Sequence, residues 1–261
     1  MYKGTFEGDA EEVEFVKRFN ANKGDYSEYL KHFTDDYSNY WMVRVTTKQI
    51  SSLSNKRVFT RADCYLIEAE DDITYLVREN EFYLSENILP ANSIKYRKVP
   101  KSGVSIKMVS SQSFQILKVG PDSFKNLFDS YELGAGASIF CQREEELVKN
   151  KDLFVGWKTT PEKMMQYFEN FTDSDNMFYL NQEICRNIKT FSSNKIAELI
   201  DNDVVLQQKV FNGIYLYDEP YSAYYFCHGD KIEELKTLPF YVTTGSGRSH
   251  GDYTIVLKPS R

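Results

Sequence analysis

The sequence predicts an α/β or α+β fold in which a mixed central sheet is flanked by helices. Helical and strand-like segments succeed one another in the order helix, strands, helices, strands. Of the 261 residues, 41% are hydrophobic and 15% aromatic, enough for a substantial core. We find no internal repeat, low-complexity segment or linker. One domain over residues 1–261 is therefore expected, with a core over 1–135 and a helical and β-rich half over 136–261.

The first element is predicted to be a helix over residues 10–20. Val13, Val16 and Phe19 recur three or four positions apart, which is the spacing of a buried helix face. Glu12 lies on the same side of this helix as the apolar stripe. We therefore expect it to be the acid of this helix that is drawn toward the core.

The remaining elements follow from apolar runs and turn residues. Strands are predicted at 41–47, 62–69, 213–227, 240–244 and 253–257, and a hairpin at 74–77 and 81–84. Helices are predicted within 26–40, at 121–133 and over most of 143–200, with an interruption at 173–176. Residues 102–109 alternate cleanly, with Val104 and Ile106 on one face and Ser105 and Lys107 on the other, as in a strand.

Composition narrows the class of protein. No apolar run reaches the 18 or more residues of a membrane span, and the first residues hold no apolar signal segment, so we expect a cytoplasmic protein without a membrane partner. The four cysteines are far apart and are expected to be reduced thiols. The three histidines lack zinc-binding spacing. Residues 134–138 (GAGAS) lack the lysine of a phosphate-binding loop, so no nucleotide cofactor is expected and a tight turn is predicted there.

Charge is separated along the chain. The net charge is −6, yet residues 44–61 hold five basic residues and 91–121 hold six, with no acid in either segment. This pattern indicates a basic face on an acidic body, as a selective polyanion binder would have. The alternative is two solvated lysine-rich loops.

Three predicted elements carry residues that together suit phosphodiester chemistry. Asp63 heads one strand, Ser105 and Lys107 share a face of another, and Glu12 comes from the packed helix. If the strands are neighbours, two carboxylates can hold Mg²⁺ between a phosphate oxygen and a water. The lysine can then orient that water or neutralise charge in the transition state.

These residues resemble the PD-(D/E)xK nuclease superfamily, and in particular the type II restriction endonucleases. Arg61-Ala62-Asp63 corresponds to the first acidic motif and Ser105-Ile106-Lys107 to the second. The helix bearing Glu12 corresponds to an N-terminal helix that often adds an acid. The segment SSQSFQILK resembles the stretch after the lysine strand, where Gln115 and Lys118 would face the DNA backbone. The resemblance covers roughly residues 8–130.

The resemblance implies a restriction-endonuclease-like core and Mg²⁺-dependent cleavage of double-stranded DNA by a homodimer at a short symmetric site. Asp63 would be the principal metal ligand, Glu12 a second acidic ligand, Lys107 the helper of the attacking water, and Ser105 the occupant of a degenerate acid position. The C-terminal half would serve DNA recognition and dimerisation. The expected phosphate contacts are Lys56, Arg57, Lys101, Gln115 and Lys118, and the glycine-rich loop at 243–252 offers Arg248 and Ser249 for base reading.

The sequence departs from the family pattern at two positions, and alternatives stay open. Ala62 replaces a proline, and Ser105 stands where an acid is expected, so Glu12, Glu68 or Asp122 would supply the missing ligand. A rival placement uses Glu79 or Glu81, which no lysine follows at the required spacing. The 44 residues from Asp63 to Lys107 also require an inserted hairpin around 74–90.

Each site residue also has a purely structural interpretation. Asp63 can bond Arg61 or a backbone amide, Lys107 can be solvated, and Glu12 can pair with Arg18 or Lys17. The alternative function is a non-catalytic or non-restriction DNA-binding or repair protein of the same fold.

Overall fold

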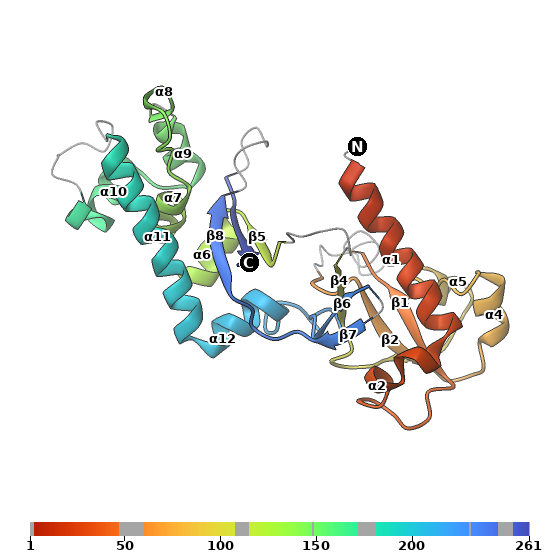
Figure 1. Cartoon of the computed structure of the whole chain (residues 1–261). Coiled ribbons are helices and arrows are strands. Elements are labelled where there is room, and N and C mark those ends of the chain that lie inside the picture. Colours follow the sequence, from red (N-terminus) through yellow and green to blue (C-terminus); the bar gives the residue numbers. More distant parts are fainter. Residues whose placement is uncertain are drawn as a thin grey trace. The chain divides into compact units, whose positions relative to one another are not determined.

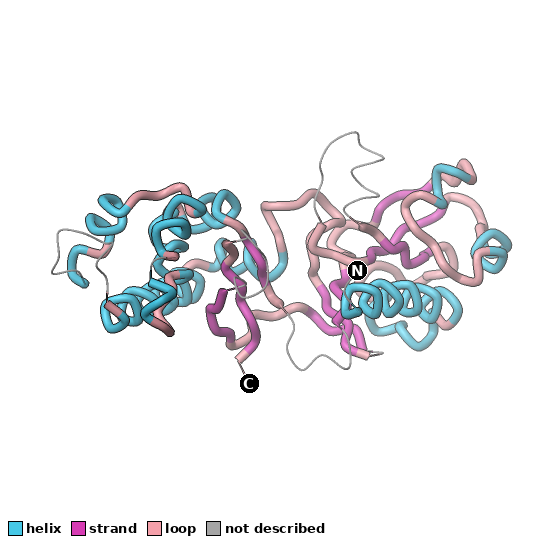
Figure 2. Tube along the Cα trace, turned by 90° about the horizontal axis from the view of Figure 1, so that it is seen from above, coloured by secondary structure: helices cyan, strands magenta, loops and turns pink. Residues whose placement is uncertain are grey.

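The structure is a computed structural model, shown in Figure 1, and describes residues 3–46, 60–107, 115–147, 149–171, 181–229, 231–244 and 253–260. The chain forms two compact units. The first comprises Met1–Gln112 and Phe211–Lys236, and the second comprises Ser113–Val210 and Thr237–Arg261. Each unit contains both helices and strands (Figure 2).

The first unit is built on a mixed sheet with strand order β1-β2-β4-β6-β7, and β3 also pairs with β2. All pairings are antiparallel except β4 with β6, which are parallel. Its strands are β1 Tyr40–Arg44, β2 Cys64–Ala69, β3 Tyr96–Lys98, β4 Val104–Lys107, β6 Tyr225–His228 and β7 Lys231–Glu234. Its helices are α1 Lys3–Ala21, η1 Lys23–Tyr26, α2 Ser27–Leu30, α4 Thr74–Glu79 and α5 Ile88–Ala91, and the π-helical turn η4 Gln208–Asn212 leads back into it.

Helices cover both faces of this sheet. On one face, Phe15, Val16 and Phe19 of α1 pack with Met42 of β1 and Leu66 of β2. On the other face, a second buried cluster joins alternate residues of the same strands to α4 and α5; it includes Trp41, Val43, Tyr65, Ile67, Val77 and Leu89. The period of two along each strand sends successive side chains to opposite faces. Strands buried on both faces therefore appear in the sequence as nearly continuous apolar runs.

The second unit is mainly helical. Its helices are α6 Pro121–Phe128, α7 Tyr131–Ser138, α8 Glu144–Leu147, α9 Asn150–Gly156, α10 Pro161–Tyr167, η2 Glu169–Phe171, α11 Gln182–Asn202 and α12 Val204–Gln207. Its strands, β5 Leu117–Val119, β8 Phe240–Thr244 and β9 Ile255–Pro259, form an antiparallel sheet in the order β5-β9-β8. Helix α7 packs along α11 (Figure 1), and its residues 133–138 are all buried.

The coarse fold prediction is confirmed: the protein is mixed α/β, with a mixed sheet flanked by helices. The helix predicted at 10–20 is α1, which begins seven residues earlier. The strands predicted at 41–47, 62–69, 240–244 and 253–257 correspond to β1, β2, β8 and β9. The strand predicted at 102–109 is found as β4, but burial does not alternate along it, because Ser105 is buried as well as Val104; residues 108–114 lie outside the described residues. The helices predicted over 143–200 are also found, while the interruption at 173–176 is outside the described residues.

Several local predictions are wrong. Residues 74–79 form helix α4 rather than a hairpin, because the Asp72 carboxylate accepts the Thr74 amide hydrogen bond at 2.9 Å and Val77 packs into the core. Of the strand predicted at 213–227, only residues 225–227 are strand, as part of β6. Gly213 and Tyr215 take positive φ values of 76° and 67°, which turn the chain.

The predicted helix at 121–133 is two helices, and the predicted turn at 134–138 is part of the second one. Asp129 has a φ of 56°, which ends α6, and the Ser130 hydroxyl accepts the Leu133 amide hydrogen bond at 3.0 Å, which starts α7. Glycine is required inside α7 because a Cβ at Gly134 would lie 2.2 Å from the Trp157 ring.

The two compact units divide the chain differently from the expected boundary at 135. The N-terminal part of the first unit ends at Gln112. Residues 211–236 also belong to this unit, because β6 pairs with β4. Over the described residues, no helix combines the length and the apolar character that crossing a membrane requires.

Candidate functional site

Asp63 immediately precedes β2, and its main chain is hydrogen-bonded on both sides. Its amide N–H donates to the Val104 carbonyl at 2.9 Å, and its carbonyl accepts from the Val45 amide at 3.0 Å. The Cys64–Val104 pair continues the antiparallel contact between β2 and β4. Asp63 is therefore placed by the sheet itself rather than by a flexible loop.

The start of β4 is fixed by two small residues. The buried Ser102 hydroxyl donates to the Val99 carbonyl at 2.7 Å and accepts from the Leu66 amide at 2.9 Å. The Gly103 carbonyl accepts from the Tyr224 and Tyr225 amides at 2.9 and 3.1 Å. These contacts set the register of β4 against both β2 and β6.

The side chains of Asp63, Ser105 and Lys107 form a continuous hydrogen-bonded chain. Asp63 Oδ2 accepts from the Ile106 amide at 2.6 Å and from Ser105 Oγ at 3.2 Å. Lys107 Nζ donates to Ser105 Oγ at 2.7 Å. The serine thus connects the acid and the lysine, and both hydrogen bonds to Asp63 end on the same carboxylate oxygen.

Glu12 approaches the same region from α1 and is paired with an arginine. Its Oε2 accepts a hydrogen bond from Arg44 Nε at 2.9 Å, and a terminal guanidinium nitrogen of Arg44 lies 2.7 Å from the same oxygen as an ion pair. The same guanidinium also pairs with Asp9 at 2.9 Å. Arg44 is the last residue of β1, so the arginine joins the helix to the sheet at the end where Asp63 lies.

Electrostatics confirm that these groups share one environment. Burial and the negative charge of Asp63 raise the pKa of Glu12 to about 7, although Arg44 acts in the opposite direction. Burial lowers the pKa of Lys107, while the charges of Asp63 and Glu12 oppose that shift. Each of the three groups therefore lies within electrostatic reach of the other two.

Asp63 and Glu12 are the two carboxylates of this region that could contribute ligands to a metal ion. Among the described residues, no group of three or more His, Cys, Asp and Glu side chains is placed to hold a metal ion. Mg²⁺, however, is usually held by one or two carboxylates together with waters and substrate phosphates. Asp63 and Glu12 each bind their protein partners through a single oxygen, which leaves Oδ1 and Oε1 as hard donors.

Two site residues were missed from the sequence. Arg44 was assigned only to the basic segment, yet it pairs with Glu12 with its side chain only 11% exposed. Arg61 was placed in the basic segment, in the first acidic motif and as a partner of Asp63, without a contact to Lys107. It lies close enough to oppose the charge of Lys107, and burial lowers the pKa of its guanidinium. Their position in the acid-free segment 44–61 was the available signal.

The predicted DNA contacts are placed only in part. Lys101 is exposed in the first unit, and its amide donates to Glu219 at 2.8 Å. Gln115 and Lys118 are exposed in the second unit, where Lys118 lies between two buried residues of β5. Lys56, Arg57, Arg248 and Ser249 lie outside the described residues. The basic segment 91–121 is therefore shared between the two units.

The alternative acids have other partners. Glu68 pairs with Arg97, where the Nε–Oε2 distance is 3.0 Å, and Glu81 pairs with Lys17 at 2.7 Å. Asp122 belongs to the second unit and pairs with Lys158. Glu79 is exposed at the end of α4. Of the acids considered, Glu12 is thus the one whose pKa is raised by the charge of Asp63.

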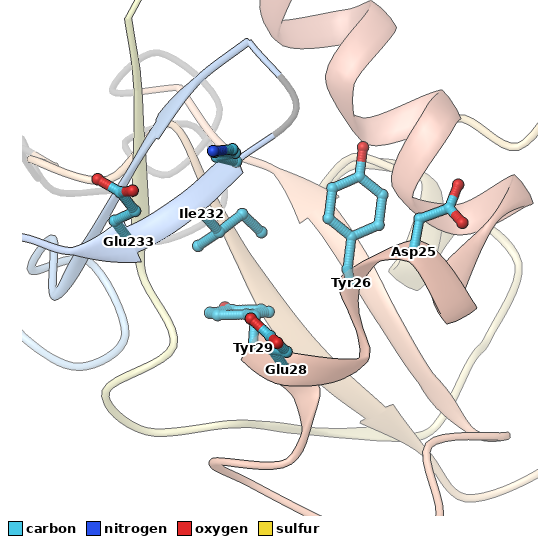
Figure 3. Close-up of a pocket in the computed structure, with 7 residues that line it drawn as sticks. Asp25, Tyr26, Glu28, Tyr29, Ile232 and Glu233 are labelled. Carbon is cyan, nitrogen blue, oxygen red and sulfur yellow. The ribbon is translucent and has the colours of Figure 1, made fainter.

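A cavity of about 300 Å³ lies elsewhere in the first unit. Figure 3 shows the side chains that surround it; it is lined by Asp25, Tyr26, Glu28, Tyr29, Lys231, Ile232 and Glu233. Three carboxylates against one lysine make its lining acidic, which opposes the binding of a phosphate backbone. None of the predicted site residues lines this cavity.

In comparisons with protein-family models and with curated proteins, no match to this chain was found. The function must therefore be inferred from the site.

Proposed function

We propose that the protein is a Mg²⁺-dependent endonuclease of double-stranded DNA, of the restriction type. The observation that carries this proposal is the hydrogen-bonded chain Asp63–Ser105–Lys107, with Glu12 within electrostatic reach. The proposal requires that the side chains of the acid at the head of one strand and of the lysine on the neighbouring strand lie close together. The 2.7 and 3.2 Å contacts through Ser105 meet that requirement.

Asp63 and Glu12 would hold the metal ion, through the oxygens that their present partners leave available. Bound Mg²⁺ supplies charge for the phosphate oxygens and lowers the pKa of a coordinated water. The Ser105 hydroxyl would offer the metal ion no negative charge. It orients Lys107 by accepting its hydrogen bond and orients Asp63 by donating to it.

Lys107 is suited to act on the attacking water or on the phosphate. Burial lowers the pKa of its ammonium group, which favours proton exchange at Nζ. The negative charges of Asp63 and Glu12 favour the charged form of Lys107 at this half-buried position. The same lysine can therefore approach a phosphate oxygen and offset the charge that develops in the transition state.

Duplex DNA is the proposed partner, and a homodimer is the proposed form, because symmetric sites are matched by two-fold symmetric proteins. Exposed Lys101, Gln115 and Lys118 would contact phosphates, which position the duplex without reading it. A net charge of −6 keeps non-specific binding to DNA weak, which favours discrimination between DNA sequences.

The test is cleavage of plasmid DNA with and without Mg²⁺. Discrete fragments that require Mg²⁺ are expected from the wild-type protein. Asp63→Ala and Lys107→Ala should each lower the rate of DNA cleavage by about a hundredfold or more. DNA binding, measured as a gel shift in Ca²⁺, should remain. Smeared products would instead indicate a general nuclease.

Matched controls come from the same elements. Glu68→Gln removes an acid of β2 that pairs with Arg97, and Lys17→Met removes a lysine of α1 that pairs with Glu81. Both variants should cut like the wild type. Full activity of Asp63→Ala or Lys107→Ala would contradict the assignment of this centre.

A non-catalytic DNA-binding or repair protein of the same fold is the second candidate. Two observations favour it: Ser105 stands where an acid is expected, and Glu12 already pairs with Arg44. The same assay separates the two candidates. Specific gel shifts without any cutting in Mg²⁺ or Mn²⁺ would select the binder.

A further inference from the structure

Glu86 is a buried carboxylate that the proposed chemistry does not use. Its side chain is 2% exposed. Its Oε1 accepts hydrogen bonds from Tyr65 Oη at 2.5 Å, Tyr221 Oη at 2.8 Å and Lys98 Nζ at 3.2 Å. Lys98 also donates to the Tyr221 hydroxyl. A buried charge with this many donors is strongly anchored, because removing any donor leaves a poorly compensated carboxylate.

The two tyrosines lead from Glu86 to the main chain on both sides of Asp63. Tyr65 follows Asp63 by two positions on β2. The Tyr221 carbonyl accepts hydrogen bonds from the Arg61 and Ala62 amides, at 2.9 and 3.0 Å. The residues immediately before Asp63 and the strand immediately after it are thus tied to one carboxylate.

The main chain around Glu86 also leads to the other acid of the site. The Glu86 amide donates to the Arg44 carbonyl at 3.3 Å, and the Arg44 amide donates to the Leu84 carbonyl at 3.0 Å. The Arg44 guanidinium in turn holds Glu12. One segment, Leu84–Glu86, therefore supports both Arg44 and the anchors of Asp63.

We propose that Glu86 is a positioning residue for the two-carboxylate centre: it fixes Asp63 through Tyr65 and Tyr221, and Glu12 through the main chain of Arg44. This role deepens the proposed function and rests on it. An ordinary structural ion pair could be lost with a general fall in stability. A positioning role instead predicts a local effect at Arg61, Ala62 and Asp63, because the hydrogen bonds from Tyr221 end there.

Two variants test the inference, Tyr221→Phe and Glu86→Gln. Tyr221→Phe removes the hydroxyl alone and keeps the ring and the carbonyl, so it remains informative if Glu86→Gln does not fold. In the metal-free protein, amide hydrogen exchange at Arg61 and Ala62 should become about tenfold faster, the scale of one hydrogen bond to a charged group. The Leu66 amide, which bonds Ser102, should exchange as before.

Cleavage kinetics supply the second readout. In both variants kcat should fall about tenfold and the Mg²⁺ concentration for half-maximal rate should rise, while KM for plasmid DNA stays within about twofold, because no DNA contact has been removed. Glu68→Gln is the matched control: it is an acid of the same strand, paired with Arg97 instead. It should change neither exchange nor kinetics.

The outcomes separate the two ideas. If the wild type cuts DNA while Tyr221→Phe folds, cuts and exchanges like the wild type, the positioning role is overturned and the proposed function stands. Faster exchange at all amides alike would also overturn it, because the effect would be one of global stability. If the wild type does not cut, the proposed function falls, and the exchange at Arg61 and Ala62 alone still decides whether Glu86 positions Asp63.

Discussion

The Asp63 side chain, just before β2, serves as a hydrogen-bond acceptor for a main-chain amide. Its carboxylate accepts the Ile106 amide at 2.6 Å, next to the backbone contact between Asp63 and Val104. An acid at the head of a core strand can have a hydrogen-bond partner, a salt-bridge partner or a metal. Here Oδ2 takes the hydrogen-bond role, which leaves Oδ1 for the proposed metal. The structural and the functional interpretations are therefore compatible.

The residue scale also gives a prediction about pH. In the metal-free protein, Glu12 has a pKa of about 7 against an ordinary value of 4.5, because of burial and the charge of Asp63. The native state therefore holds a proton that the unfolded state has lost between these two values. The stabilisation from this proton is fully present below pH 4.5 and is lost as pH rises through 7, by up to ~1.4 kcal/mol per pH unit.

Glu12→Gln should remove this pH dependence. Urea unfolding between pH 5 and 7.5, in the presence of a chelator, measures it as a flatter slope of the free energy of unfolding against pH. Glu14→Gln, an exposed acid of the same helix, is the control and should keep the wild-type slope. An equal slope in wild type and Glu12→Gln would mean that burial and the charge of Asp63 do not raise the pKa of Glu12 as described.

At the element scale, the placement of Lys107 depends on close packing between the residue before β4 and the neighbouring main chain. Gly103 precedes β4, and a Cβ there would lie 2.0 Å from the Ser222 carbonyl oxygen and 2.7 Å from that of Pro220. Both neighbours are backbone atoms, which cannot move aside as a flexible side chain can. Glycine is therefore required at 103 by space rather than by φ.

Gly103→Ala should destabilise the protein by about 3 kcal/mol, the upper end of the cost of overpacking a tight site. The control is Gly24→Ala, since a Cβ at Gly24 meets nothing within 4 Å. Urea midpoints of the two variants measure the difference. A midpoint for Gly103→Ala equal to that of Gly24→Ala would show that the approach of Ser222 to β4 is looser than described.

Elements were predictable from the sequence where periodicity and tertiary packing agree. Helix α1 buries the apolar face that its spacing indicates, and β1 and β2, which were predicted from apolar runs, are buried on both faces. Residues 74–79 have strand-like composition but form α4, because local hydrogen bonding at Asp72 and the burial of Val77 prevail. The short β3 was not predicted, since three residues carry too little pattern.

At the scale of the whole molecule, the first unit is discontinuous in sequence. Strand β6, from residues 225–228, pairs in parallel with β4, and Tyr225 and Cys227 are buried in the cluster under α1. A core that ended at residue 135 would leave one edge of β4 unpaired and this cluster open to solvent. The strand that bears Lys107 therefore depends on residues more than a hundred positions away.

Two truncations test this dependence. Residues 1–210 and 1–236 both lack β8 and β9 of the second unit, and they differ only in the segment 211–236. We expect 1–236 to retain protease-resistant β2 and β4, and 1–210 to lose that protection. Limited proteolysis with mass spectrometry measures it. Equal protection in both fragments would mean that the first unit does not need β6 and β7.

The sequence by itself determined the class of fold, the amphipathic helix with Glu12 on its inner side, and the strands that bear Asp63 and Lys107, because these depend on local periodicity. Only the tertiary structure decided that β2 and β4 are neighbours, that Ser105 connects Asp63 to Lys107, and that Arg44 pairs with Glu12. Strand order and register are set by contacts between residues distant in sequence, and a local pattern carries no information about them. The support of Asp63 by Glu86 through Tyr221 joins residues 135 positions apart and belongs wholly to that second kind.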